Sequence, residues 1–267
     1  PGELYCIAGS LGFQTLPLLN SFFQNIPVDQ LKTMLLDGLE SLKNRSLIWE
    51  EGGKTVTDQT LKNLVEVIGR PQYALAIFNM TKSEPPSQSF IYFKAGQSLA
   101  VTQKGRYFDL SLFRDRVSLK RTLDSWIGIS SQVSDKAKPI IIPSLDTAIR
   151  LMSAVWKDPY KATEKLEASG VDEKEVDDLM KVVQPCTFFS RLTRINWENN
   201  VSAQISRLLV LGNSSSLWAQ EIIQNNPVVS EFTPFHCSDL SVMLRKYIHV
   251  DFNEPTSGTD AAENQEI

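Results

Sequence analysis

The chain has 267 residues, a formal net charge of −4 and 42% hydrophobic residues. This hydrophobic content is ordinary for a folded protein and too high for a disordered one. The acidic balance argues against a general nucleic-acid binder, which needs a basic face to neutralise phosphates. Arg114, Arg116, Lys120 and Arg121 do fall close together, but the usual fate of such a charge run is a solvated helix face.

Two further classes of protein are disfavoured by the sequence. No run approaches the roughly 20 consecutive apolar residues of a membrane span, and the first residues lack the pattern of a signal peptide. The three cysteines, Cys6, Cys186 and Cys237, fit neither a disulfide framework nor a zinc-binding spacing. A reducing compartment is the simpler interpretation. We therefore expect a cytoplasmic protein without a membrane contact or a bound metal.

The first part of the chain is predicted to be mainly helical. Residues 4–11 fit either a helix or a buried extended segment. The leucines within residues 28–43 step by four, four and three, which predicts an amphipathic helix. Gly52 and Gly53 predict a tight turn. An apolar stripe over residues 61–68 then predicts a helix that Thr57 or Asp58 caps and that ends before Pro71.

The period changes to that of strands over residues 73–112. Four short runs there are apolar, aromatic or alternating, and turn residues such as Pro85 and Pro86 separate them. Strands this close in sequence pair antiparallel, because a parallel crossover needs about a dozen residues or more. We predict a four-stranded meander, followed by a helix over residues 112–127 that covers one face of the sheet.

The second part of the chain repeats this order of elements. Helices are predicted over residues 144–156 and 159–170, and a third begins at Asp172 and runs as an apolar stripe into Pro185. A second meander over residues 186–233 and a closing helix to Tyr247 follow. The predicted fold class is therefore α+β, with a central antiparallel sheet flanked by helical bundles and two similar halves related by pseudo-twofold symmetry.

The repeat also suggests where the chain divides. We place an N-terminal α+β half at residues 1–129, a polar linker at 130–143 and a C-terminal α+β half at 144–252. Residues 253–267 are acidic and polar, and we expect this tail to be disordered. The two halves, which we interpret as an internal duplication, are expected to form one compact domain.

No catalytic motif is found in the sequence. Phosphate-binding loops, dinucleotide-binding turns, zinc-protease motifs and nucleophile elbows are all missing. A Cys–His nucleophile pair would have to use neighbours such as His236 and Cys237, whose side chains usually point apart. We expect no catalytic residue, metal site or cofactor. Trp197 precedes a predicted turn, so it is either an exposed anchor for a partner or an ordinary core residue.

Several stretches, taken in order, resemble the EspG proteins, cytosolic chaperones of type VII (ESX) secretion. They are residues 38–47, in which Ser46 replaces the glycine of the family pattern, then 61–71, 166–171 and 218–234, and the closing helix with Leu240, Leu244 and Tyr247. The resemblance extends over most of residues 15–250. It implies a non-catalytic protein that binds the apolar tip of a helical PE–PPE pair and keeps it soluble.

The resemblance also implies that one loop contacts the partner. The matching positions are Lys82, Ser83, Glu84, Pro85, Pro86, Ser87 and Gln88. The leading hypothesis is thus a module or chaperone that binds a helical protein, which requires an apolar groove rather than catalytic residues. We expect an exposed apolar patch beside the loop.

Two other hypotheses stay open. One is an enzyme with a dispersed site near His236, which would show a deep pocket with convergent polar groups. The other is a structural or self-assembling protein that dimerises through an edge strand, so the chain is either a monomer or a homodimer.

Overall fold

The computed structural model describes residues 1–23, 26–104, 107–113, 115–127, 139–142, 145–168, 170–198, 201–213, 216–223, 230–234 and 237–248. Its main sheet contains nine described strands: β3 (Tyr73–Thr81), β4 (Ser87–Lys94), β5 (Gln97–Lys104), β6 (Tyr107–Phe113), β7 (Ile140–Ile142), β8 (Phe188–Glu198), β9 (Val201–Gly212), β10 (Leu217–Ile223) and β11 (Ser230–Pro234). Their spatial order is β6-β5-β4-β3-β8-β9-β10-β11-β7, and every neighbouring pair is antiparallel.

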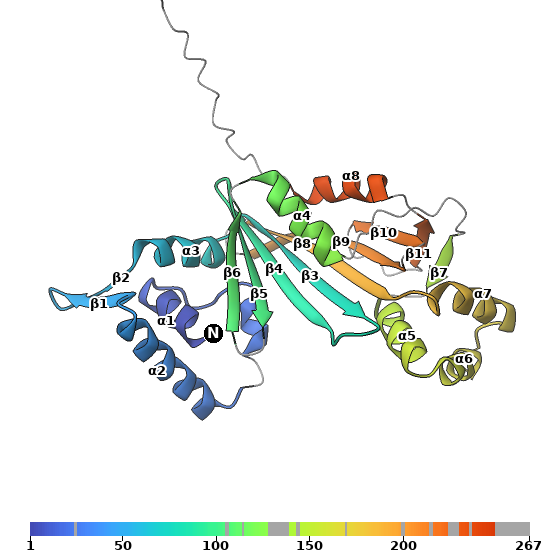
Figure 1. Ribbon diagram of the computed structural model, residues 1–267, viewed down its shortest axis with the longest axis horizontal. Coiled ribbons are helices and arrows are strands. Elements are labelled where there is room, and N and C mark those ends of the chain that lie inside the picture. Colours follow the sequence, from blue (N-terminus) through green and yellow to red (C-terminus); the bar gives the residue numbers. More distant parts are fainter. Residues whose placement is uncertain are drawn as a thin grey trace, which may run out of the picture.

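Helices cover both faces of this sheet. The helices are α1 (Gly2–Ser10), α2 (Val28–Asn44), α3 (Gln59–Gly69), α4 (Arg116–Ile127), α5 (Leu145–Lys157), α6 (Pro159–Ala168), α7 (Glu173–Val183) and α8 (Cys237–Tyr247), with a short 3-10 helix at Leu19–Phe22 and a small hairpin of β1 (Ile48–Glu51) and β2 (Lys54–Thr57). Helices α4 and α8 lie over one face, whereas α1–α3 and α5–α7 gather at opposite ends of the molecule (Figure 1). The predicted α+β class is confirmed.

The pairing of β3 with β8 joins the two halves into one sheet. The pairs run from Tyr73 opposite Asn196 to Thr81 opposite Phe188, and Ile77 faces Leu192 at the midpoint. From this pair outward, both halves continue as a meander, so the pseudo-twofold axis passes close to it. The core beneath α4 and α8 draws buried side chains from both halves, including Leu75, Ile77, Leu123, Leu192, Leu208 and Leu244.

Helices α3 and α7 occupy corresponding places, each just before the first strand of a meander. Each spans 11 residues and begins after an aspartate. The Asp58 carboxylate accepts from the Thr60 backbone N–H at 2.9 Å, and Asp172 accepts from Lys174 at 2.9 Å. Both caps satisfy amide groups that lack a partner within the helix. Each helix stops just before a proline, Pro71 or Pro185, which cannot continue a helix.

The structure differs from the predicted elements in two places and decides between two alternatives in a third. Leu112 and Phe113 end β6 rather than begin a helix, and α4 starts only after Asp115, whose carboxylate accepts from the Ser118 N–H at 2.8 Å. Residues 140–142, within the predicted linker, form β7 and pair with β11. Residues 4–11 belong largely to α1, which settles the choice between a helix and an extended segment. The predicted tail, 253–267, lies outside the described residues.

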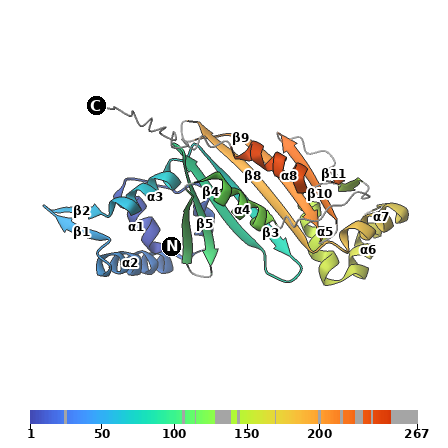
Figure 2. The same cartoon turned by 45° about the horizontal axis from the view of Figure 1, so that its top comes forward.

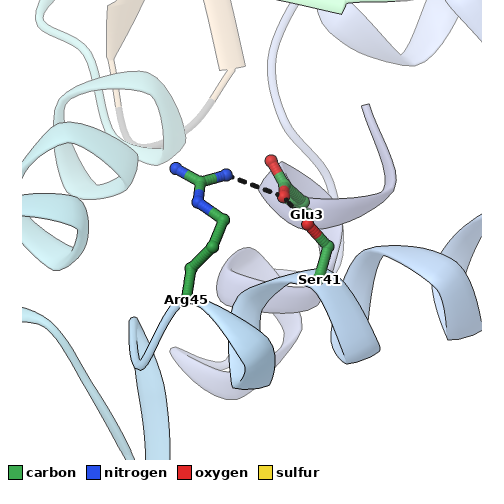
Figure 3. Close-up of polar contacts among 3 residues, drawn as sticks. All are labelled: Glu3, Ser41 and Arg45. Carbon is green, nitrogen blue, oxygen red and sulfur yellow. Dashed lines mark hydrogen bonds and ion pairs between the residues drawn. The ribbon is translucent and has the colours of Figure 1, made fainter.

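Helices α1 and α2 cross at a very short separation. A Cβ atom added to Gly38 would lie 2.5 Å from the Glu3 backbone nitrogen, so no side chain fits there. Close to this crossing, one Glu3 carboxylate oxygen accepts from Ser41 Oγ at 2.6 Å and from the Arg45 guanidinium at 3.0 Å (Figure 3). These contacts connect the start of α1 to the C-terminal end of α2.

Ser46 occupies a backbone conformation that favours glycine. It lies between α2 and β1 with φ at 55°, and the left-handed region costs a residue with a side chain roughly 1–2 kcal/mol. Because glycine also loses more chain entropy on folding, we expect Ser46→Gly to raise the free energy of unfolding by about 0.5–1 kcal/mol. Urea denaturation would measure this change. Ser111→Gly, in the extended strand β6, is the control and should lower the free energy of unfolding. If both variants lower the free energy of unfolding equally, the explanation is wrong.

We also predict that neither half folds alone. A fragment of residues 1–129 would leave one edge of β3 unpaired and would lose the partners of Ile77 that β8 supplies. Each half expressed separately should therefore lack a cooperative thermal transition, whereas co-expressed fragments 1–129 and 130–252 should co-purify and unfold together. A monomeric 1–129 fragment with its own sharp transition would show two independent domains instead.

Candidate partner-binding groove

The predicted partner-binding loop is an exposed hairpin end. Residues 82–86 connect β3 to β4, and Ser87 and Gln88 already belong to β4. Lys82 through Ser87 are exposed and Gln88 is half-buried. The Thr81 hydroxyl accepts from the Glu84 N–H at 3.0 Å, which holds the chain as it leaves β3. The loop lies at the end of β3 that approaches α5 and α6 (Figure 2).

Trp197 lies far from this loop. Its backbone N–H donates to the Gln72 carbonyl at 3.1 Å, next to the start of β3, and its half-buried side chain packs against the core formed with α1–α3. The loop follows the other end of the nine-residue β3, about 30 Å away at the usual strand rise. The structure therefore does not bring Trp197 and the loop together. A partner contact at Trp197 stays a prediction.

The two predicted segments are nevertheless related by the pseudo-twofold axis. The loop ends the β3–β4 hairpin, and Trp197 lies near the end of the β8–β9 hairpin. Each hairpin reaches toward the helices of the opposite half: Pro86 lies beside α5 and α6, whereas Trp197 packs with the α1–α3 core.

A groove of about 660 Å³ separates the β3–β4 hairpin from α5 and α6. Six residues form its apolar lining: Phe78, Met80, Pro86, Ile149, Ala154 and Ala162. Six more are polar or charged: Arg150, Ser153, Lys157, Asp158, Lys161 and Lys165. The predicted loop thus contributes one wall through Pro86. The contribution of α5 and α6 was missed, because no local pattern shows which distant hairpin will face a helix.

Helix α5 is oriented by its buried face. Leu151, Met152 and Val155 pack into the core formed with Phe189 and Leu211 of the sheet. The Trp156 indole N–H also donates to the Cys186 carbonyl at 2.8 Å, which fixes the end of the helix. Positions 149, 150, 153, 154 and 157 recur at helical spacing and line the groove.

Helix α6 follows after a single turn-forming residue, Asp158. Its carboxylate accepts from the Lys161 N–H at 3.2 Å and lies 3.4 Å from the Lys161 ammonium. The backbone hydrogen bond from Lys161 lowers the pKa of the Asp158 carboxyl, with the Lys161 side chain adding to the shift. Lys161, Ala162 and Lys165 face the groove, whereas Glu164 and Glu167 are not among its lining residues.

The groove offers little for catalysis. None of the described lining residues is a histidine or a cysteine, and Ser153 supplies the only hydroxyl among them. The nearby Cys186 thiol donates to the Val182 carbonyl at 3.2 Å, and burial raises its pKa to about 12, so the thiolate nucleophile is not formed at neutral pH. His236, the centre of the enzyme hypothesis, lies outside the described residues. This arrangement suits binding of an apolar surface.

The described residues form neither a metal site nor a membrane-spanning helix. No group of three or more His, Cys, Asp or Glu side chains there could hold a metal ion. None of the described helices is both long enough and apolar enough to cross a membrane.

Comparison with known proteins supports the fold. No family model and no curated protein sequence matches the chain. A solved structure of the Mycobacterium tuberculosis type VII secretion system chaperone EspG5, in complex with the PE25–PPE41 dimer, is similar with a TM-score of 0.56 and 7% sequence identity. The match covers 93% of this chain and 94% of that chain. The resemblance inferred from the sequence is thus confirmed at the level of the fold, which is EspG-like.

Proposed function

We propose that this protein is a non-catalytic binding module that holds a helical segment of a partner protein in the groove between the β3–β4 hairpin and α5–α6. The observation that carries the proposal is the groove itself. Its lining combines apolar side chains of the sheet, the hairpin and two helices, including Phe78, Pro86 and Ile149. The exposed loop of residues 82–86 stands at its edge.

The chemistry of the groove favours a helix as the bound element. An amphipathic helix recognises an apolar groove through side chains at positions i, i+3, i+4 and i+7, and its own backbone is already hydrogen-bonded. An extended peptide would instead need a free strand edge for main-chain pairing. Both strands of this hairpin are already paired on both sides, β3 with β4 and β8, and β4 with β3 and β5.

The similarity to EspG5 supports a chaperone role. That protein is a type VII secretion system chaperone solved with a PE25–PPE41 dimer bound. By this likeness we propose that the chain acts in the cytoplasm, where it covers an apolar helical surface of a protein before secretion.

A second candidate function is self-assembly through β6. This strand is an edge of the sheet, and its Tyr107 and Leu112 side chains are 75% and 42% exposed. A long apolar edge strand is a template for pairing with another chain. Size-exclusion chromatography with light scattering would reveal a homodimer, which Leu112→Lys should return to a monomer.

We predict that a bulky residue in the groove removes partner binding. Ser153→Trp places an indole on the groove wall, so partner recovery from the native host should fall at least about tenfold, the equivalent of about 1.4 kcal/mol. Pull-down followed by mass spectrometry measures this recovery. Ser125→Trp, on the exposed side of α4, is the matched control and should retain the partner.

A second variant tests the loop separately. Replacement of residues 82–86 by glycine and serine leaves β3 and β4 intact and should weaken recovery of the same partner. If the set of recovered proteins is the same for wild type, Ser153→Trp and the loop variant, the groove is not the binding site.

A further inference from the structure

We infer that the groove selects partner helices whose apolar stripe is flanked by aspartate or glutamate. This inference rests on the proposed function and adds the chemical class of the partner. It comes from the distribution of charge around the groove. The chain as a whole carries a net charge of −4, yet the described lining residues of the groove include four cations and one carboxylate: Arg150, Lys157, Lys161, Lys165 and Asp158.

Asp158, the one carboxylate among the described lining residues, is already engaged. Asp158 accepts from the Lys161 N–H and lies in ion-pair distance of the Lys161 ammonium, at 3.4 Å. Among the ion pairs found between described residues, none involves Arg150, Lys157 or Lys165. All three are exposed. The groove therefore presents cations that the described part of the protein does not neutralise.

The cations lie on two neighbouring helices and on the same side as the apolar lining. On α5, Arg150 and Lys157 are two helical turns apart, about 10 Å along the axis. On α6, Lys161 and Lys165 are one turn apart, and the acidic residues of that helix, Glu164 and Glu167, stay outside the groove. A bound helix would bury its apolar stripe on Phe78, Ile149 and Ala154, and carboxylates beside the stripe would meet these cations.

A nucleic acid fits these observations less well. A nucleic-acid surface combines many phosphate-binding cations with aromatic platforms for bases. Here four cations surround a concave apolar surface, and Phe78 is the only aromatic side chain among the described lining residues. An acidic amphipathic helix satisfies both the apolar lining and the surrounding charge.

The test is selection from a displayed library of amphipathic helices of about 20 residues, long enough for five turns. Apolar positions vary among Leu, Ile, Met and Phe, and flanking positions vary among Glu, Gln and Lys. The full chain should enrich Glu over Lys at flanking positions by about tenfold at low salt, and the ratio should shrink at high salt because ions screen exposed charges.

Charge-reversal variants provide the matched comparison. Lys157→Glu combined with Lys165→Glu should reverse the preference toward lysine-flanked helices. Lys32→Glu combined with Lys174→Glu changes two exposed lysines of α2 and α7. Each pair takes the net charge from −4 to −8, since each substitution contributes −2. Only a local effect of the groove can separate the two variants, so the α2/α7 variant should select as wild type does.

The outcomes distinguish this inference from the proposed function. If helices are enriched and Ser153→Trp abolishes their binding, but Glu and Lys flanks are equally frequent, charge selection is wrong and helix binding stands. If the library yields no helix whose binding is abolished by Ser153→Trp, both the charge selection and the proposed function are wrong. A competition experiment tests the nucleic-acid alternative. If a short single-stranded DNA displaces the selected acidic helices at a lower concentration than free helix does, the groove is a nucleic-acid surface and the inference is overturned.

Discussion

The antiparallel pairing of β3 with β8 is the interaction on which the rest of the structure depends. Each strand begins the meander of its own half, and each would be an exposed edge without the other. Their pairing produces one continuous sheet and one core beneath α4 and α8. It also carries each hairpin end toward the helices of the opposite half. The groove exists because the β3–β4 hairpin extends past the midpoint to α5 and α6.

The two ends of the molecule use the same plan with different results. At the N-terminal end, α1 and α2 cross closely at glycines, and Trp197 packs against the buried core. At the C-terminal end, α5 and α6 bury one face each and leave a groove of about 660 Å³ facing the hairpin. The arrangement of the elements is therefore pseudo-symmetric, and the candidate groove is formed where the two ends differ. The β1–β2 hairpin and β7 are further departures, each described on one side of the axis only.

Charge is separated in the C-terminal half. Helix α7 begins with Glu173 and Glu175, where negative charge suits the helix dipole, while four of the five charged side chains in the described groove lining are cations. Exposed cations of this kind cost little stability, because water solvates them and surface ion pairs contribute only about 0–1 kcal/mol. Such a pattern affects the choice of partner more than the fold.

Local patterns in the sequence determined most elements, including the Asp172 cap, both proline stops and the two meanders. They did so because helix caps, turns and strand periodicity depend on neighbouring residues. The sequence left Thr57 or Asp58 as the cap of α3, and the structure shows Asp58 in that position. The order of several stretches along the sequence also resembles that of the EspG proteins, and the fold agrees with this resemblance. Only the tertiary structure decided that β7 adds to the sheet and that Trp197 lies far from the predicted loop. It also decided that Pro86, Ile149 and Lys161 share one groove. Those relations depend on contacts between segments distant in sequence, which a local pattern does not encode.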